Sequence, residues 1–142
     1  WAPVGGLARA LLLRGEDAEA LAVLRAGRQR LPGAMLLPYL EAMVLATSGS
    51  RDVRDGALAL ALAEQTARVT SFQDPAALLA FASAAAETGD DLAARRLLDS
   101  AEALARAGRK PELLPALEEA QRQISSRARV RFSAGDWERY RL

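Results

Sequence analysis

The chain lacks two residue types that carry much of protein chemistry: its 142 residues include no cysteine and no histidine. Zinc sites of the usual kind, thiol nucleophiles and histidine-based triads are therefore excluded. The absence of cysteine leaves the compartment open, because such a chain is compatible with both the cytoplasm and the periplasm.

Residues typical of β-sheets are also scarce. Aromatic residues make up 5% of the chain although 51% of its residues are hydrophobic, and most of the hydrophobic residues are alanine or leucine. Alanine, leucine, arginine and glutamate favour helices, whereas strands are rich in β-branched and aromatic residues. The composition thus predicts an all-α fold.

The chain has neither a large net charge nor a long apolar run. A formal net charge of +1 gives no indication of a nucleic-acid or membrane partner. The longest purely apolar run, near Ala10–Leu13, is far too short to cross a bilayer, and no signal peptide is visible. We expect no membrane insertion by this segment. Because the first residue is Trp1 rather than methionine, we expect a longer parent protein, whose other part could hold an anchor or a targeting signal.

Residues 74–101 have the pattern of two short helices joined by a turn at Thr88-Gly89-Asp90. Small residues recur where the two helices would touch, and larger apolar residues lie about one turn away. The small positions are Ala82, Ala85, Ala94 and Ala101, and the larger ones are Leu78, Phe81, Leu92 and Leu98. Each such hairpin leaves apolar surface that a neighbouring hairpin must cover.

The same order occurs twice more. In residues 1–34 it has a turn at Arg14-Gly15-Glu16-Asp17 and ends at Pro32. In residues 35–74 we expect helices over 34–47 and 53–69, and the extra residues of this copy fit in the loop 48–52, which is rich in turn formers. The spacing is close to a period of about 34 residues.

This period resembles the tetratricopeptide repeat family, as do the Leu7-Ala8 pair, the glycine at the inter-helix turn and Pro32. Residues 46–75 resemble a subtype common in bacterial multidomain proteins. The aromatic positions of the first and third copies hold neither Trp nor Tyr. Pro38 lies in a first helical turn, where free amides tolerate it. The resemblance implies a right-handed superhelix of stacked antiparallel hairpins, an α-solenoid, with repeats at about 1–34, 35–74 and 75–108.

The residues after the repeats divide into a helix and a tail. Pro111 and Glu112 favour the start of a helix over 111–125, which resembles the capping helix of such arrays and completes a domain spanning 1–126. In the tail, 127–142, the residues up to Phe132 alternate like a strand, so a hairpin, a segment docked on the helices and a frayed end all stay open. Arginines beside aromatics such as Trp137 suit single-stranded nucleic acid, which we consider the less favoured partner.

No arrangement of residues indicates catalysis, a cofactor or a metal. The acidic pairs are Glu16-Asp17, Asp90-Asp91 and Glu118-Glu119, and the first two lie at inter-helix turns, where acids cap the next helix. Gly5-Gly6 lacks the spacing of a phosphate-binding loop. We therefore expect no enzyme activity.

The candidate binding site follows from the family resemblance, because the first helix of each repeat lines the concave side in that family. Projecting the helical period onto the chain gives a groove in which Tyr39 and Met43 are apolar anchors and Arg9 is the polar contact. The alternative is that Leu12, Leu36 and Leu79 belong to the core. Family members that bind the tails of chaperones hold the terminal carboxylate with several basic residues. Because only Arg9 is basic here, the resemblance disfavours that function. The candidate groove residues are Arg9, Leu12, Leu36, Tyr39, Met43, Leu79 and Ser83.

The resemblance implies a protein–protein interaction or scaffolding module of a larger bacterial protein, which binds a peptide or helix in this groove. The alternative is a regulatory or structural appendage of a membrane enzyme, such as a glycosyltransferase or kinase, that packs on its parent chain. A homodimer through end helices is a further hypothesis, because Leu7 and Leu11 have no preceding repeat to cover them.

Overall fold

The computed structural model describes residues 2–34, 36–140 and 142, and every regular element within these residues is helical. The prediction of an all-α chain is thus confirmed. The elements, in chain order, are α1 (Ala2–Leu13), α2 (Asp17–Arg30), α3 (Leu36–Thr47), α4 (Gly56–Val69), α5 (Pro75–Glu87), α6 (Asp91–Arg106), the 3₁₀ helix η1 (Pro111–Leu113), α7 (Leu114–Ser125) and α8 (Ala134–Arg139).

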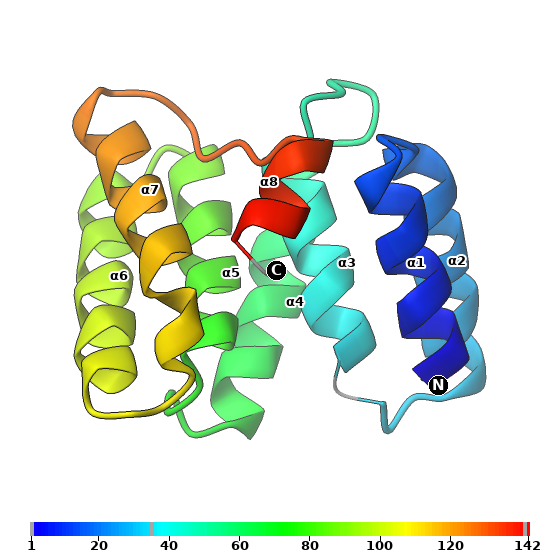
Figure 1. Cartoon of the computed structure of the whole chain (residues 1–142), viewed down its shortest axis with the longest axis horizontal. Coiled ribbons are helices and arrows are strands. Elements are labelled where there is room, and N and C mark those ends of the chain that lie inside the picture. Colours follow the sequence, from blue (N-terminus) through cyan, green and yellow to red (C-terminus); the bar gives the residue numbers. More distant parts are fainter. Residues whose placement is uncertain (1, 35, 141) are drawn as a thin grey trace.

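The helices pack largely in chain order, as Figure 1 shows. α1–α2, α3–α4 and α5–α6 form antiparallel pairs, and α3 also packs against α2 and α5. α7 lies against α6 and touches α5, while α8 touches α1. The predicted turns at 14–17 and 88–90 join α1 to α2 and α5 to α6, and the helix predicted over 111–125 is η1 followed by α7.

Aspartates start three of these helices. Asp55, Asp74 and Asp90 precede α4, α5 and α6, and each side chain accepts a hydrogen bond from a backbone N–H of the first turn, at 3.1, 3.0 and 3.1 Å. These bonds satisfy N–H groups that the start of a helix leaves without a partner. Gly89 closes the turn before α6 with a φ of 94°, a conformation that glycine adopts without strain. Local sequence signals therefore account for where these helices begin.

The hydrophobic core centres on α3 and α5. Residues 39–48 are all buried, and so are residues 75–86 apart from the partly buried Phe81. α5 is rich in alanine, which lets neighbouring helices approach closely. Gly27 in α2 has the same effect, because an added Cβ would lie 2.6 Å from a Val4 methyl group of α1. Small residues thus set the distance between helices.

One carboxylate lies within this core. The side chain of Glu41 in α3 is 0% exposed, and it accepts hydrogen bonds from the Nε atoms of Arg28, at 2.6 Å, and Arg25, at 3.3 Å. Both arginines come from α2 and keep part of their side chains in solvent. A buried charge is tolerated only when it is paired and hydrogen-bonded, so this contact determines how α2 can lie on α3.

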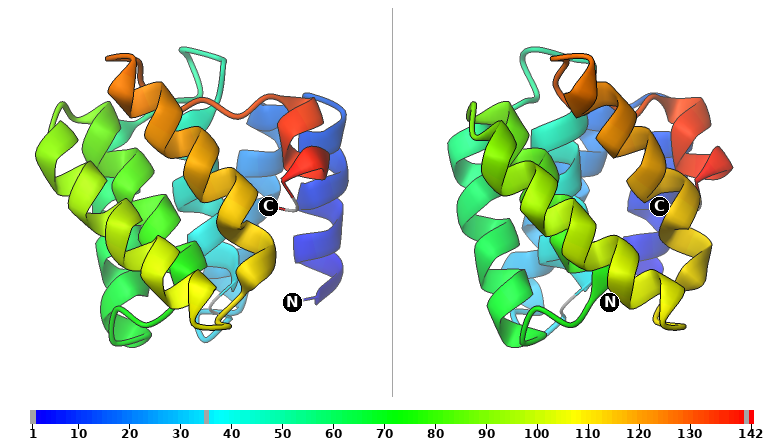
Figure 2. Two further views of the ribbon diagram at one scale, coloured as in Figure 1. Left: turned by 60° about the vertical axis from the view of Figure 1, so that its left-hand side comes forward. Right: turned by 90° about the vertical axis from the view of Figure 1, so that its left-hand side faces the viewer.

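Within residues 127–140 and 142 the tail packs against the helices, which is one of the three alternatives left open from the sequence, and it forms no hairpin. Residues 128–133 run without regular structure, and the helix α8 follows them. α8 begins with a capping box in which Ser133 and Asp136 bond each other's backbone N–H groups. Figure 2 shows the tail passing from the end of α7 to α8, which lies beside α1.

Candidate functional site

Three of the seven predicted groove residues meet at one cavity. Arg9 of α1 and Leu36 and Tyr39 of α3 line a cavity of about 350 Å³ that also touches α4, the start of α5, η1 and Leu142. Arg9 is exposed, Leu36 is half-buried, and Tyr39 is 7% exposed. For these three residues, the helical period and the order of the repeats correctly predicted that they lie close together.

The other four predicted groove residues lie in the core. Leu12, Met43, Leu79 and Ser83 are each 0% exposed, and the Ser83 hydroxyl donates to the Leu79 carbonyl at 2.8 Å within α5. The structure corrects their assignment to an open groove, and for Leu12 and Leu79 the alternative of a core position holds. The reason is that α3 and α5 have neighbours on several sides, which helical spacing alone does not reveal.

The cavity combines an apolar floor with charged walls. Leu36, Leu113 and Leu142 contribute apolar surface. Lys110 forms an ion pair with Asp74 at 2.9 Å on one wall. Thr66 and Thr70 also line the cavity, but their hydroxyls already donate to backbone carbonyls of α4, at 2.9 to 3.1 Å. Charged groups around an apolar floor suit a ligand with an apolar body and a polar end.

Tyr39 lines this cavity, and its phenol is neutral. Burial raises the pKa of Tyr39 far above its ordinary value, the positive charge of Arg9 opposes this rise, and the negative charge of Asp74 adds to it. The phenol therefore keeps its proton at all ordinary pH values. It can donate a hydrogen bond to a ligand oxygen, next to the guanidinium of Arg9.

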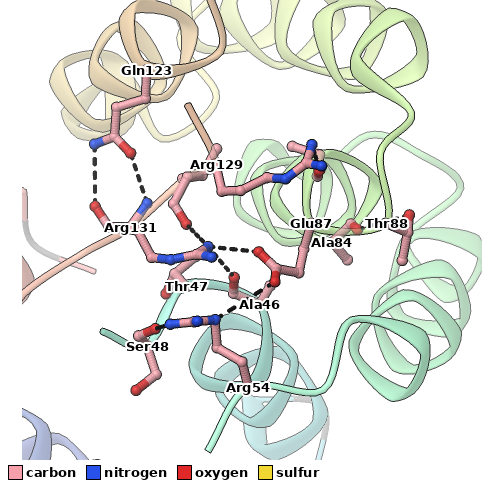
Figure 3. A network of polar contacts seen from close by, with 12 residues as sticks. Ala46, Thr47, Ser48, Arg54, Ala84, Glu87, Thr88, Gln123, Arg129 and Arg131 are labelled. Carbon is pink, nitrogen blue, oxygen red and sulfur yellow. Dashed lines mark hydrogen bonds and ion pairs between the residues drawn. The ribbon is translucent and has the colours of Figure 1, made fainter. Parts of the chain in front are cut away.

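A second polar site lies at the opposite ends of the same helices, where the tail crosses α5 and α3 (Figure 3). Arg131 donates to the Glu87 carboxylate at 2.6 Å and to the Ala46 carbonyl at 3.3 Å. Arg129 donates to the Ala86 carbonyl at 2.6 Å. The backbone N–H of Phe132 donates to the Thr47 carbonyl at 3.2 Å. We call these acceptors, from Ala46, Thr47, Ala86 and Glu87, the helix-end site.

The physical reason for the helix-end site is the group of carbonyl acceptors at a helix C-terminus. The last four carbonyls of a helix have no partner within it and carry a partial negative charge. Glu87 ends α5 and adds a full negative charge where the helix dipole disfavours it, so it requires cations. Arg131 at 2.6 Å and Arg54 at 3.6 Å supply them.

α7 holds the tail in register over this site. The side-chain amide of Gln123 accepts from the backbone N–H of Arg131 at 2.7 Å and donates to the carbonyl of the same residue at 3.1 Å. This pair of bonds resembles the contact of one strand with another. Val130 and Phe132, on either side, are 1% and 2% exposed. The tail therefore alternates between apolar residues in the core and arginines at the helix ends.

These contacts also bear on the alternative that the tail binds single-stranded nucleic acid. Phe132 and Trp137 are buried, at 2% and 4% exposure, and cannot stack on bases in this conformation. Arg129 and Arg131 are engaged with the helix-end site. In this conformation Phe132, Trp137, Arg129 and Arg131 do not form the open nucleic-acid surface that was the less favoured alternative from the sequence.

Sequence reasoning missed the pairing of Glu87 with Arg131, which are far apart in the chain. A signal was present, because an acidic residue at the C-terminus of a helix calls for a cation. The tail offers arginines at alternating positions, but nothing in the sequence says which acid they reach.

The acidic pairs make different contacts from one another. Asp90 caps α6 as expected, but Glu16 makes no capping bond to α2 and instead pairs with Arg14 at 2.9 Å. Asp17 accepts from the Ser48 hydroxyl at 2.6 Å. In the described part of the chain no cluster of three or more potential metal ligands occurs. Nor does any helix among these residues have the length and apolar character needed to span a bilayer.

No protein-family model, curated protein or solved structure is significantly similar to this chain.

Proposed function

We propose that this chain is a non-catalytic protein-interaction module of the tetratricopeptide type, whose hairpins stack into a short α-solenoid. The packing of α1–α2, α3–α4 and α5–α6 in chain order supports this arrangement, with α7 in the position of a capping helix. Each of the repeats expected at about 1–34, 35–74 and 75–108 contains one of these helix pairs, which also supports the proposal.

One observation carries the proposed function: an extended segment of the chain already lies on the ends of α3 and α5. Its backbone bonds to Thr47 and to Gln123, and its side chains fill apolar and polar positions alternately. This is the way in which a groove receives an extended peptide, with backbone bonds for affinity and side-chain positions for selectivity. The face of α3 and α5 thus has the chemistry of a peptide receptor.

The cavity at Arg9 and Tyr39, at the other ends of α3 and α5, is open to a ligand. We assign it to an apolar side chain of a partner peptide that packs on Leu36 and Leu113. A neighbouring carbonyl or carboxylate of the peptide accepts from the Arg9 guanidinium and the Tyr39 hydroxyl.

The experiment is a selection of binding peptides from a random displayed library on the whole chain. Each enriched peptide is then titrated by fluorescence anisotropy against Arg9→Glu and against Arg96→Glu, a matched charge reversal at an exposed position of α6. We expect Arg9→Glu to weaken binding by about tenfold or more and Arg96→Glu to leave it unchanged. Equal binding by both variants, or no enriched peptide, contradicts the proposed function.

A further inference from the structure

The helix-end site selects a definite pattern of side chains. Arg129 reaches the end of α5 and Arg131 bridges the ends of α5 and α3, while Val130 and Phe132 enter the core. An extended chain places residues two apart on the same side, so the site reads Arg-x-Arg followed by an aromatic residue. Charge complementarity supports this specificity, because the arginines meet helix C-termini and the carboxylates of Glu87 and Asp91.

The segment that occupies the site is held only by contacts with other elements. Residues 128–132 form no helix or strand, and Arg129 and Arg131 keep 46% and 31% of their side chains exposed. The tail leaves α7 at Arg127, whose φ of 60° lies in the left-handed region that a non-glycine residue adopts at a cost. A segment with no regular structure of its own and with partly exposed arginines can be exchanged for another of the same pattern, provided that the new segment also supplies the apolar side chains that Val130 and Phe132 bury.

We propose that the helix-end site is a receptor for extended peptides of the pattern Arg-x-Arg-aromatic, and that residues 129–132 occupy it as a tethered ligand which a partner protein's segment of this pattern replaces. This inference rests on the proposed function and names the class of partner. The tether keeps the site closed to weak competitors, because a linked segment acts at an effective concentration in the millimolar range, roughly.

The test uses the full chain and a fluorescent synthetic peptide with the sequence of residues 127–133 as the probe. In the variant Arg129→Ala/Arg131→Ala the chain's own tail is weakened but the helix-end site is intact. We expect this variant to bind the probe about tenfold or more tightly than the unaltered chain does. A probe with the same two arginines replaced by alanine should show no such gain.

Glu87→Gln, added to the double variant, removes the carboxylate of the site and should abolish the gain. Gln123→Ala, added to the double variant, should also reduce the gain, because the same amide would bond the backbone of the bound probe. Circular dichroism selects the variants that keep their helices. If the tail's contacts with the helix-end site were merely structural, their removal would not increase probe binding.

Equal probe binding by the unaltered chain and by folded tail variants overturns the inference. So does a dimer of the unaltered chain that is lost on Arg129→Ala/Arg131→Ala, because the tail of a second copy would then be the natural occupant. Failure here leaves the proposed function standing, since the Arg9 cavity is tested with different variants and ligands.

Discussion

Glu41 is a carboxylate fully shielded from solvent, and its two arginine partners come from α2. Glu41→Gln keeps the shape but removes the charge, so Arg25 and Arg28 lose their anchor on α3. We expect the free energy of unfolding to fall by about 2 kcal/mol, measured by urea denaturation. Glu64→Gln is the control, because its pair with Arg68 is exposed and should contribute less than about 0.5 kcal/mol. Equal effects of the two substitutions would show that burial adds nothing to the Glu41 contact.

Tyr39 makes stability depend on alkaline pH. Its pKa in the folded chain is raised, chiefly by burial, so above about pH 10 the unfolded chain releases the phenol proton while the folded chain keeps it. The free energy of unfolding should therefore decrease as pH rises beyond this point, by up to about 1.4 kcal/mol per pH unit. Tyr39→Phe should remove this part of the slope. Identical slopes for this variant and the unaltered chain would contradict the burial of the phenol.

At the scale of elements, the distance between α1 and α2 depends on Gly27. A Cβ there would lie 2.6 Å from Val4 Cγ1 and 3.2 Å from a Leu37 methyl group, whereas a Cβ at Gly6 would meet no atom within 4 Å. We expect Gly27→Ala to destabilise the chain by about 1–3 kcal/mol through overpacking, although alanine favours helices. Gly6→Ala should stabilise it by about 0.5–1 kcal/mol. Thermal unfolding of both variants is the measurement, and a stabilised Gly27→Ala would contradict this packing.

The helices were predictable where the signal is local, and other features were not. Asp74 and Asp90 as caps and Gly89 as a turn residue mark the boundaries of α5 and α6. α8 was not foreseen among the alternatives left open for the tail, although Ser133 and Asp136 have the spacing of a capping box. The helical period and the repeat register predicted the cavity residues Arg9 and Tyr39. They did not predict that neighbouring helices also bury the other sides of α3 and α5. A period says which residues share a face, and only the tertiary contacts say what covers it.

At the scale of the whole molecule, the tail connects elements that a linear array would leave apart. It bonds to α7 through Gln123, to α5 through Glu87 and to α3 through Thr47, and α8 then packs on α1. In a row of hairpins each unit is stabilised only by its neighbours, so a defect at α5 would loosen α4 and α6. A tail that joins both ends should instead carry that defect to α1.

Hydrogen exchange of the Glu87→Gln variant distinguishes these cases. We expect faster exchange at the backbone N–H groups of Arg131 and Phe132, which bond to Gln123 and Thr47, together with faster exchange in α8 and α1. α4 should change little, because it packs on α3 and α5. Exchange confined to α5 and its direct neighbours would contradict the connection. Faster exchange in α1 would establish that release of the tail at one end of the molecule is felt at the other, which is what a partner that displaces the tail would exploit.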